Sequence, residues 1–298
     1  MVIGIDPTVD FACKRLLGSP DHPAITLHFL NAVLRFPSPI RQAQILNPTI
    51  EKGFPDDKWS LLDILAKDDQ GRLFDIEVQT TRPLGLSRRL AYYASCLLVG
   101  QLESGGDYLD LRPSIGICLL DAIEFPDEDA WHHAFQLRSE DGLLLTDCLR
   151  IHLLELPKYV PPGDNRIIED PTEQWLYFFR RAGKSTAEEL IARLPDPVFA
   201  EAIGVLEMIA KNPEERRLYD ERLKMERDER ARNRQAREEG RQEGRQEGRQ
   251  EGAMIGRIQV LQELNGLPSQ SADDLANRSA DELLALEADL QRKLRDRS

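Results

Sequence analysis

Acidic side chains interrupt two consecutive apolar segments of the chain, and their spacing could support chemistry. In SLLDILAKDDQGRLFDIEVQTT, Asp63 lies within one apolar run, and Asp75, Glu77 and Gln79 alternate with apolar residues in the next. Successive side chains of a β-strand point to opposite faces of the sheet. The sequence therefore predicts that Asp75, Glu77 and Gln79 share one face of a strand, while the apolar residues between them take the other.

The turn between the two runs determines which residues face each other. A three-residue loop over residues 69–71, with Gly71 in the left-handed conformation, predicts a hairpin in which Asp63 lies opposite Glu77. A two-residue loop would shift the register by one and put these two side chains on different faces. Hydrogen-bond pairing of Asp63 with Ile76 would therefore exclude the three-residue loop.

A carboxylate pair of this kind is suited to hold a metal ion. Two carboxylates about 5 Å apart on one sheet face repel each other unless a proton or a cation intervenes. Oxygen ligands alone suit Mg²⁺ or Mn²⁺ rather than Zn²⁺. Such an ion lowers the pKa of a bound water and stabilises charge on a phosphate, and Gln79 could orient the attacking water. The alternative is an ordinary hairpin whose acids face solvent, because the D…ExQ spacing is short and common by chance.

The hairpin lies within a longer series of short apolar runs and turns. Helical spacing is found over residues 11–17, 24–34 and 86–103, and strand patterns are found over 42–50, 59–67, 73–80, 114–120, 131–137 and 149–156. This order predicts an α/β domain in which a mixed sheet is flanked by helices. The aromatic cluster of Trp175, Tyr177, Phe178 and Phe179 is interpreted as core packing rather than as a platform for base stacking.

The composition excludes several classes of protein. The chain has 298 residues, and 39 Lys and Arg against 52 Asp and Glu give a net charge of 39 − 52 = −13. This charge argues against a protein that coats nucleic acid, although not against an enzyme with a local basic patch. No signal peptide and no apolar run of about 20 residues is visible, and the four cysteines are scattered singly. We therefore expect a cytoplasmic protein with reduced thiols and no membrane partner.

A charge-dense connector over residues 211–257 follows the apolar body. It holds 14 Lys and Arg and 12 Asp and Glu, so its net charge is 14 − 12 = +2. Glycines recur in it at every fourth position, at Gly240, Gly244, Gly248, Gly252 and Gly256. One interpretation is a solvated, partly helical linker; the other is a homo-oligomer formed by close packing of helices along the glycine stripe. Two short amphipathic helices are expected after the repeat, over 255–264 and 280–294.

The D-x13-E-x-Q spacing, with apolar residues around it, resembles the PD-(D/E)xK nuclease superfamily. More narrowly, DPTVDFACKRLLG, LDILAKDDQGRLFDIEVQT, LSRRLAYYASCLL and CLRIHLLELPKY resemble motifs of the Rpn-type recombination-promoting nuclease and transposase family. The resemblance covers residues 5–180 and implies a restriction-endonuclease-like mixed sheet core. The chain would then comprise a nuclease-like domain (1–180), a helical extension (181–210), the charged helical connector (211–257) and a small helical tail (258–298).

Carried over position by position, the resemblance also implies roles for single residues. Asp63 and Glu77 would be catalytic carboxylates that bind Mg²⁺ or Mn²⁺, and Asp10 would be an auxiliary acid on the first helix. Gln79 stands where the superfamily usually has Lys, which puts the strength of catalysis in doubt.

Basic residues beside these motifs could contact DNA. Lys14 is expected either to meet phosphate or to balance Asp10, and Arg88 and Arg89 either to meet phosphate or to pair with surface acids. We therefore expect a Mg²⁺-dependent DNA endonuclease linked to recombination or mobile elements. The alternative is a catalytically weak nuclease-fold module for binding or assembly that oligomerises through its tail, which Gln79 and the acidic charge favour. A transposase proper would also perform strand transfer.

Overall fold

The computed structural model of the chain describes residues 1–46, 63–103, 105–163 and 166–296. The chain forms two compact units, Met1–Arg227 and Asp228–Ser298. Parts of the predicted strands over 42–50 and 59–67 lie outside the described residues.

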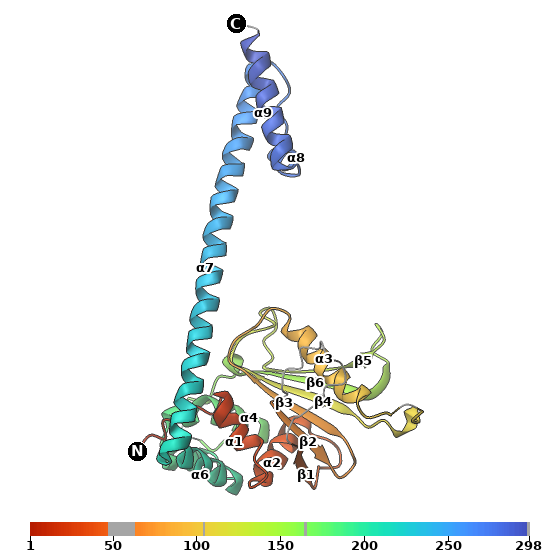
Figure 1. Cartoon of the computed structure of the whole chain (residues 1–298), viewed down its shortest axis with the longest axis vertical. Helices are drawn as coiled ribbons and strands as arrows, with labels where there is room; N and C mark the ends of the chain where they lie inside the picture. The colour runs from red at the N-terminus through yellow and green to blue at the C-terminus, as the bar shows by residue number, and fades with distance from the viewer. Residues whose placement is uncertain (47–62, 104, 164–165, 297–298) are drawn as a thin grey trace. The chain divides into compact units, whose positions relative to one another are not determined.

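The first unit is built on a mixed sheet, as predicted (Figure 1). Its described strands are β1 (Ala43–Leu46), β2 (Ile64–Asp68), β3 (Leu73–Gln79), β4 (Ser114–Leu120), β5 (His132–Arg138) and β6 (Leu144–Glu155), in the order β1-β2-β3-β4-β6-β5. The central strands β3, β4 and β6 are parallel, and β1, β2 and β5 pair antiparallel at the two sides. Parallel strands need cover on both faces, and every residue of β4 is buried.

Helices supply this cover. One face is covered by α1 (Asp10–Leu17) and α2 (Pro23–Leu34), and the other by α3 (Leu86–Val99). The helices α4 (Pro171–Arg181) and α6 (Pro197–Lys211) belong to the same core as α1 and α2, and α6 packs on both of them. The helix α5 (Ala187–Arg193) and short 3-10 turns at Tyr108–Asp110, Leu156–Lys158 and Ala182–Lys184 complete the unit. The helices α4 and α6 start at a proline that follows an aspartate, and Asp170 and Asp196 accept the first free backbone N–H groups.

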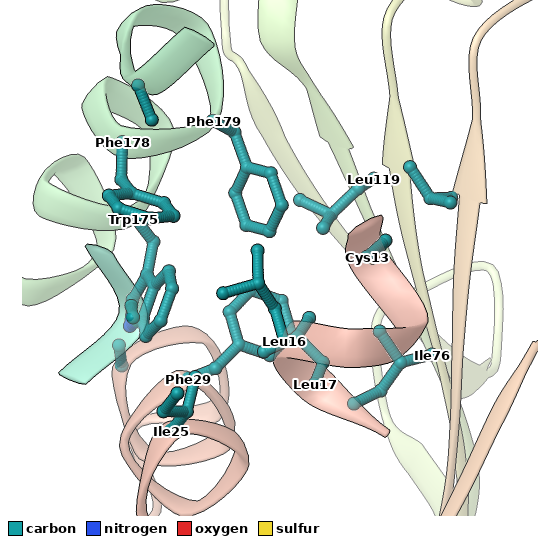
Figure 2. Packing of buried hydrophobic residues seen from close by; sticks show 14 of the residues in the cluster. Cys13, Leu16, Leu17, Ile25, Phe29, Ile76, Leu119, Trp175, Phe178 and Phe179 are labelled. Atoms are coloured by element: carbon teal, nitrogen blue, oxygen red, sulfur yellow. The ribbon is translucent and has the colours of Figure 1, made fainter. Parts of the chain in front are cut away.

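The larger core lies between α1, α2, α4 and the sheet (Figure 2). Side chains from the three helices meet Ile76 of β3 and Leu119 of β4 there. The predicted core role of the aromatic cluster is confirmed, because Trp175 and Phe178 are completely buried. Burial of a large apolar side chain stabilises the fold by about 2–3 kcal/mol, so this core fixes α1 firmly against β3.

Two strand and helix ends differ from the prediction. The strand β6 begins at Leu144 rather than at residue 149, because it pairs with β5 across a turn in which Gly142 has a φ of +85°. Its first half is largely exposed, and Thr146 and Asp147 interrupt the apolar pattern there, so the apolar run used for the prediction begins only at Leu149. The helix α3 ends at Val99 rather than at residue 103. Gly100 follows Val99 and closes the last turn, because its N–H donates to the carbonyl of Cys96.

The helix α7 (Pro213–Leu264) is continuous over 52 residues. Residues 255–264 are helical and end at Leu264, as predicted, but they form the last turns of α7 rather than a separate short helix. Interior glycines cost about 1 kcal/mol each relative to alanine without breaking a helix, and ion pairs four residues apart support it, such as Arg216 with Asp220.

In the second unit, the end of α7 packs against two short helices. These are α8 (Ala272–Ala276) and α9 (Ala280–Arg295), and the small core between them consists of Ile255, Ile258, Leu275, Leu283 and Leu290. The predicted tail helix over 280–294 is confirmed, and a capping box at Ser279 and Glu282 starts it. Within the described part of the chain, no helix has the length and apolar character needed to cross a membrane.

Candidate active site

The loop between β2 and β3 has the predicted three-residue form. Gly71 has a φ of +82°, a left-handed conformation that glycine adopts without strain. The N–H of Gly71 donates to the carbonyl of Asp68 (3.1 Å), and the N–H of Asp68 donates to the carbonyl of Arg72 (3.1 Å). The Arg72 guanidinium also pairs with the buried Asp68 carboxylate at 2.6 Å. The turn is therefore fixed by its backbone and by one ion pair.

The register that this loop sets brings two carboxylates together. Ile64 pairs with Ile76, so the preceding residue, Asp63, reaches Glu77, as predicted. The N–H of Asp63 approaches Glu77 Oε1 at 3.4 Å, and the N–H of Val78 donates to Asp63 Oδ2 at 3.3 Å. Each carboxylate thus accepts a backbone N–H of the opposite strand, which holds both side chains on the hairpin.

The Glu77 side chain is contacted from two directions. Gln79 Nε2 donates to Glu77 Oε2 at 3.1 Å, so these two residues share a face as the alternation predicts. Arg89 of α3 places Nη2 at 3.8 Å from the same oxygen. Arg88, one position earlier on α3, is exposed to solvent. Of the two arginines that the sequence proposed for DNA, the structure therefore brings only Arg89 to the carboxylates.

The Asp63 side chain is contacted by α1. Lys14 Nζ lies 3.1 Å from Asp63 Oδ1 and 2.9 Å from Asp10 Oδ1, so the ammonium bridges the two carboxylates. Asp10 and Lys14 are four residues apart, which puts them on one face of α1. The Lys14 side chain remains 39% exposed. Lys14 thus balances Asp10, one of its two predicted roles, and keeps access to solvent at the site.

Burial, together with the neighbouring negative charges, raises the pKa values of these carboxyl groups. Burial first, and then the charge of Asp63, raise the pKa of Glu77 to about 7. Burial raises the pKa of Asp63 despite the opposing effect of Lys14. For Lys14 itself, burial lowers the pKa, but the nearby carboxylates Asp63 and Asp10 outweigh it and the net direction is upward. Burial and the neighbouring carboxylates thus both disfavour the charged forms of Asp63 and Glu77.

Asp75 is a member of the site that the sequence reasoning did not assign. It precedes Glu77 by two residues on the same face of β3 and is 1% exposed. Its Oδ1 has no hydrogen-bond partner among the described residues, and burial followed by the charges of Glu77 and Asp63 raises its pKa well above the usual range. The alternation of Asp75 with Glu77 was the signal that could have identified it.

The donor set fits a hard divalent cation that keeps part of its water shell. Among the residues that the structure describes, no group of three or more His, Cys, Asp or Glu side chains converges in a way that could enclose a metal. Asp63 and Glu77 offer carboxylate oxygens from opposed positions of the hairpin. Mg²⁺ is typically held by one or two carboxylates and several waters, so these residues fit it.

Comparison with known proteins gives one match. Residues 7–236 match the model of a family described as PD-(D/E)XK nuclease family transposase. No curated protein and no solved structure matches the chain significantly. The family match spans most of the chain, including the hairpin with Asp63 and Glu77, and it agrees with the mixed sheet and its flanking helices. The chain therefore belongs to the PD-(D/E)XK nuclease family transposases.

Proposed function

We propose that this protein is a Mg²⁺- or Mn²⁺-dependent DNA endonuclease that hydrolyses phosphodiester bonds and acts in recombination or on mobile elements. The observation that carries the proposal is the opposition of Asp63 and Glu77 across the β2–β3 hairpin. The family match supports a nuclease-type hydrolase. The four cysteines are free thiols, which suits action in the cytoplasm.

In this proposal Asp63 and Glu77 hold the metal ion. When bound, the ion would lower the pKa of its water and stabilise the charge that builds on the phosphate. Asp63 is oriented by the N–H of Val78, and Glu77 is oriented by the Gln79 amide. The neutral Gln79 side chain can orient an attacking water but brings no positive charge to it.

The positive charge of the site comes from helices instead. Lys14 of α1 and Arg89 of α3 lie beside Asp63 and Glu77 respectively. We propose that these two side chains, with the exposed Arg88, contact DNA phosphate near the site. Because the net charge of the chain is −13, its affinity for DNA should be modest and should fall steeply with salt.

The test is nicking of supercoiled plasmid with Mg²⁺, with Mn²⁺ and with chelator. Asp63→Asn and Glu77→Gln remove one charge each at nearly constant shape, and both should lower the nicking rate at least about 100-fold. Asp69→Asn, an exposed residue in the turn of the same hairpin, is the matched control and should leave the rate unchanged. Equal trace rates for the wild type and Asp63→Asn would show that the activity is a contaminant.

A second candidate function is a nuclease-fold module for binding or assembly that oligomerises through residues 211–257. The pairing of Asp63 with Lys14 favours it, because an internal cation already occupies part of the proposed metal site. Calorimetric titration with Mn²⁺ separates the two candidates. The enzyme should bind Mn²⁺ in a manner that Glu77→Gln abolishes, whereas the module should bind DNA with no such metal dependence.

A further inference from the structure

The first turns of α7 contact the N-terminal segment and α1 through one face. The side chains involved are Glu215, Tyr219, Arg222 and Glu226, and all of them lie within the first compact unit. Their spacing of four, three and four residues matches the helical period, so they form one stripe along α7. These contacts place the start of α7 beside α1 within the first unit (Figure 1).

The first two residues of the stripe, Glu215 and Tyr219, hold the chain on either side of the start of α1. Glu215 pairs with Arg15 at 2.8 Å, and the Tyr219 hydroxyl accepts the N–H of Asp6 at 2.9 Å. Tyr219 is 2% exposed, so this contact is part of the packed interior. The position of α1 is thus tied to α7 on both sides of its first turn.

The last two residues of the stripe, Arg222 and Glu226, contact Asp10 directly. The helix α1 begins after Val9, whose side chain cannot accept a hydrogen bond, so its first turn needs an acceptor from elsewhere. Glu226 Oε1 accepts the N–H of Asp10 at 3.1 Å. A carboxylate at this position also interacts favourably with the positive end of the helix dipole. Glu226 thus acts as the N-terminal cap of α1, although it lies on a different helix.

Arg222 extends this contact into the site. Its Nε lies 3.0 Å from Asp10 Oδ2, while Lys14 holds the other oxygen of the same carboxylate. Lys14 in turn reaches Asp63. A continuous line of ion pairs therefore runs from α7 to the hairpin, and Asp10 shares its charge between two cations. Without Arg222, the Asp10 carboxylate would compete with Asp63 for Lys14 with its full charge.

We propose that Arg222 and Glu226 are positioning residues of the site, which hold α1 and Asp10 so that Lys14 stays on Asp63. The inference rests on the nuclease function proposed above and extends it to the base of the connector. If the inference holds, the geometry of the site depends on the position of the first turns of α7. A partner that displaces these turns would therefore change the rate of cleavage.

The experiment compares variants of the full-length chain. Arg222→Gln and Glu226→Ala break the two contacts with Asp10, and Arg222→Lys and Glu226→Gln preserve a cation and an acceptor. Arg217→Gln with Glu221→Gln is the matched control, because these residues form an exposed pair on α7 at 2.7 Å. The measurements are kcat and KM for plasmid nicking, and hydrogen exchange of the amides of α1.

Arg222→Gln and Glu226→Ala should lower kcat about tenfold to a hundredfold, as expected for a misplaced catalytic group. KM should rise by a smaller factor, because Arg88 and Arg89 on α3 are unaffected. The amides at the start of α1 should exchange faster in both. The conservative variants should recover most of kcat, and the control pair should match the wild type. If Glu226→Ala does not fold, Arg222→Gln decides, because it leaves the backbone contact of α1 in place.

Two outcomes would overturn the inference, and they are distinguishable. If the wild type nicks DNA and both disruptive variants keep its kcat, the positioning role is wrong and the nuclease proposal stands, even where α1 exchanges faster. If the wild type fails to nick DNA in the presence of either Mg²⁺ or Mn²⁺, the nuclease proposal fails and the positioning role fails with it.

Discussion

Replacement of the glycines of α7 by alanine should stabilise this helix strongly. Apart from the adjacent residues and the nearby backbone of α7 itself, an added β-carbon at Gly240, Gly244, Gly248, Gly252 or Gly256 would meet no described atom within 4 Å. Each replacement therefore gains helix propensity without a clash, at about 0.8–1.0 kcal/mol. The five together should add roughly 4–5 kcal/mol to the stability of this part of α7.

Hydrogen exchange of the amides over 240–256 measures this gain, because about 1.4 kcal/mol corresponds to a tenfold change in an opening equilibrium. At protein concentrations where light scattering reports a monomer, the five-alanine variant should exchange about 1,000-fold to 5,000-fold more slowly than the wild type. Equal or faster exchange would refute the reasoning, since it would mean that the glycines make a close contact within the chain.

The same variant tests the proposed homo-oligomer. If two copies of α7 pack along the glycine stripe, five methyl groups should hold the helices apart and convert an oligomer into a monomer. Alanine at the exposed residues Gln242, Gln246 and Gln250 has the same four-residue spacing and serves as the control. An oligomer that survives the glycine replacements would show that the stripe is not its interface.

Further predictions concern the site and the sheet. Lys14→Met should lower kcat at least tenfold but cost only about 1 kcal/mol in urea unfolding, because the ammonium is partly exposed. Gln79→Lys should raise the nicking rate, because it brings a cation to Glu77; a rate below the wild type would contradict this. Burial lowers the pKa values of His132 and His152 to about 4. Unfolding free energy should therefore fall by about 1.4 kcal/mol per pH unit for each as pH drops from 6.5 towards 4, and His152→Asn should flatten this dependence.

The hairpin that carries Asp63 and Glu77 could be predicted from the sequence because its determinants are local. A single glycine in a three-residue loop fixes the register, and alternation then assigns each side chain to a face. The same local signals located α1, α2 and α3 to within a few residues. The central strands were equally evident, because strands buried on both faces are continuous apolar runs.

The remainder of the site could not be predicted, because it depends on contacts between distant segments. The spacing of Lys14 and Asp10 indicates that they can pair, but nothing in the sequence indicates that Lys14 also reaches Asp63. The capping of α1 by Glu226 is equally hidden, since caps are recognised from neighbouring residues. The continuity of α7 over 52 residues is not evident from the sequence, because a glycine at every fourth position lowers helix propensity while ion pairs four residues apart support the helix.

The contact between Asp10 and Glu226 spans 216 positions of the chain. Because the chain is made from its N-terminus, this separation determines the order in which the parts of the site come together. A nascent chain that has released α1 and the hairpin already carries the carboxylates of the site. The cap of α1 and the Arg222 contact with Asp10 are still missing at that stage, because these residues have not left the ribosome. Domains fold as their residues emerge, so we expect the site to be completed only after the body around it has formed.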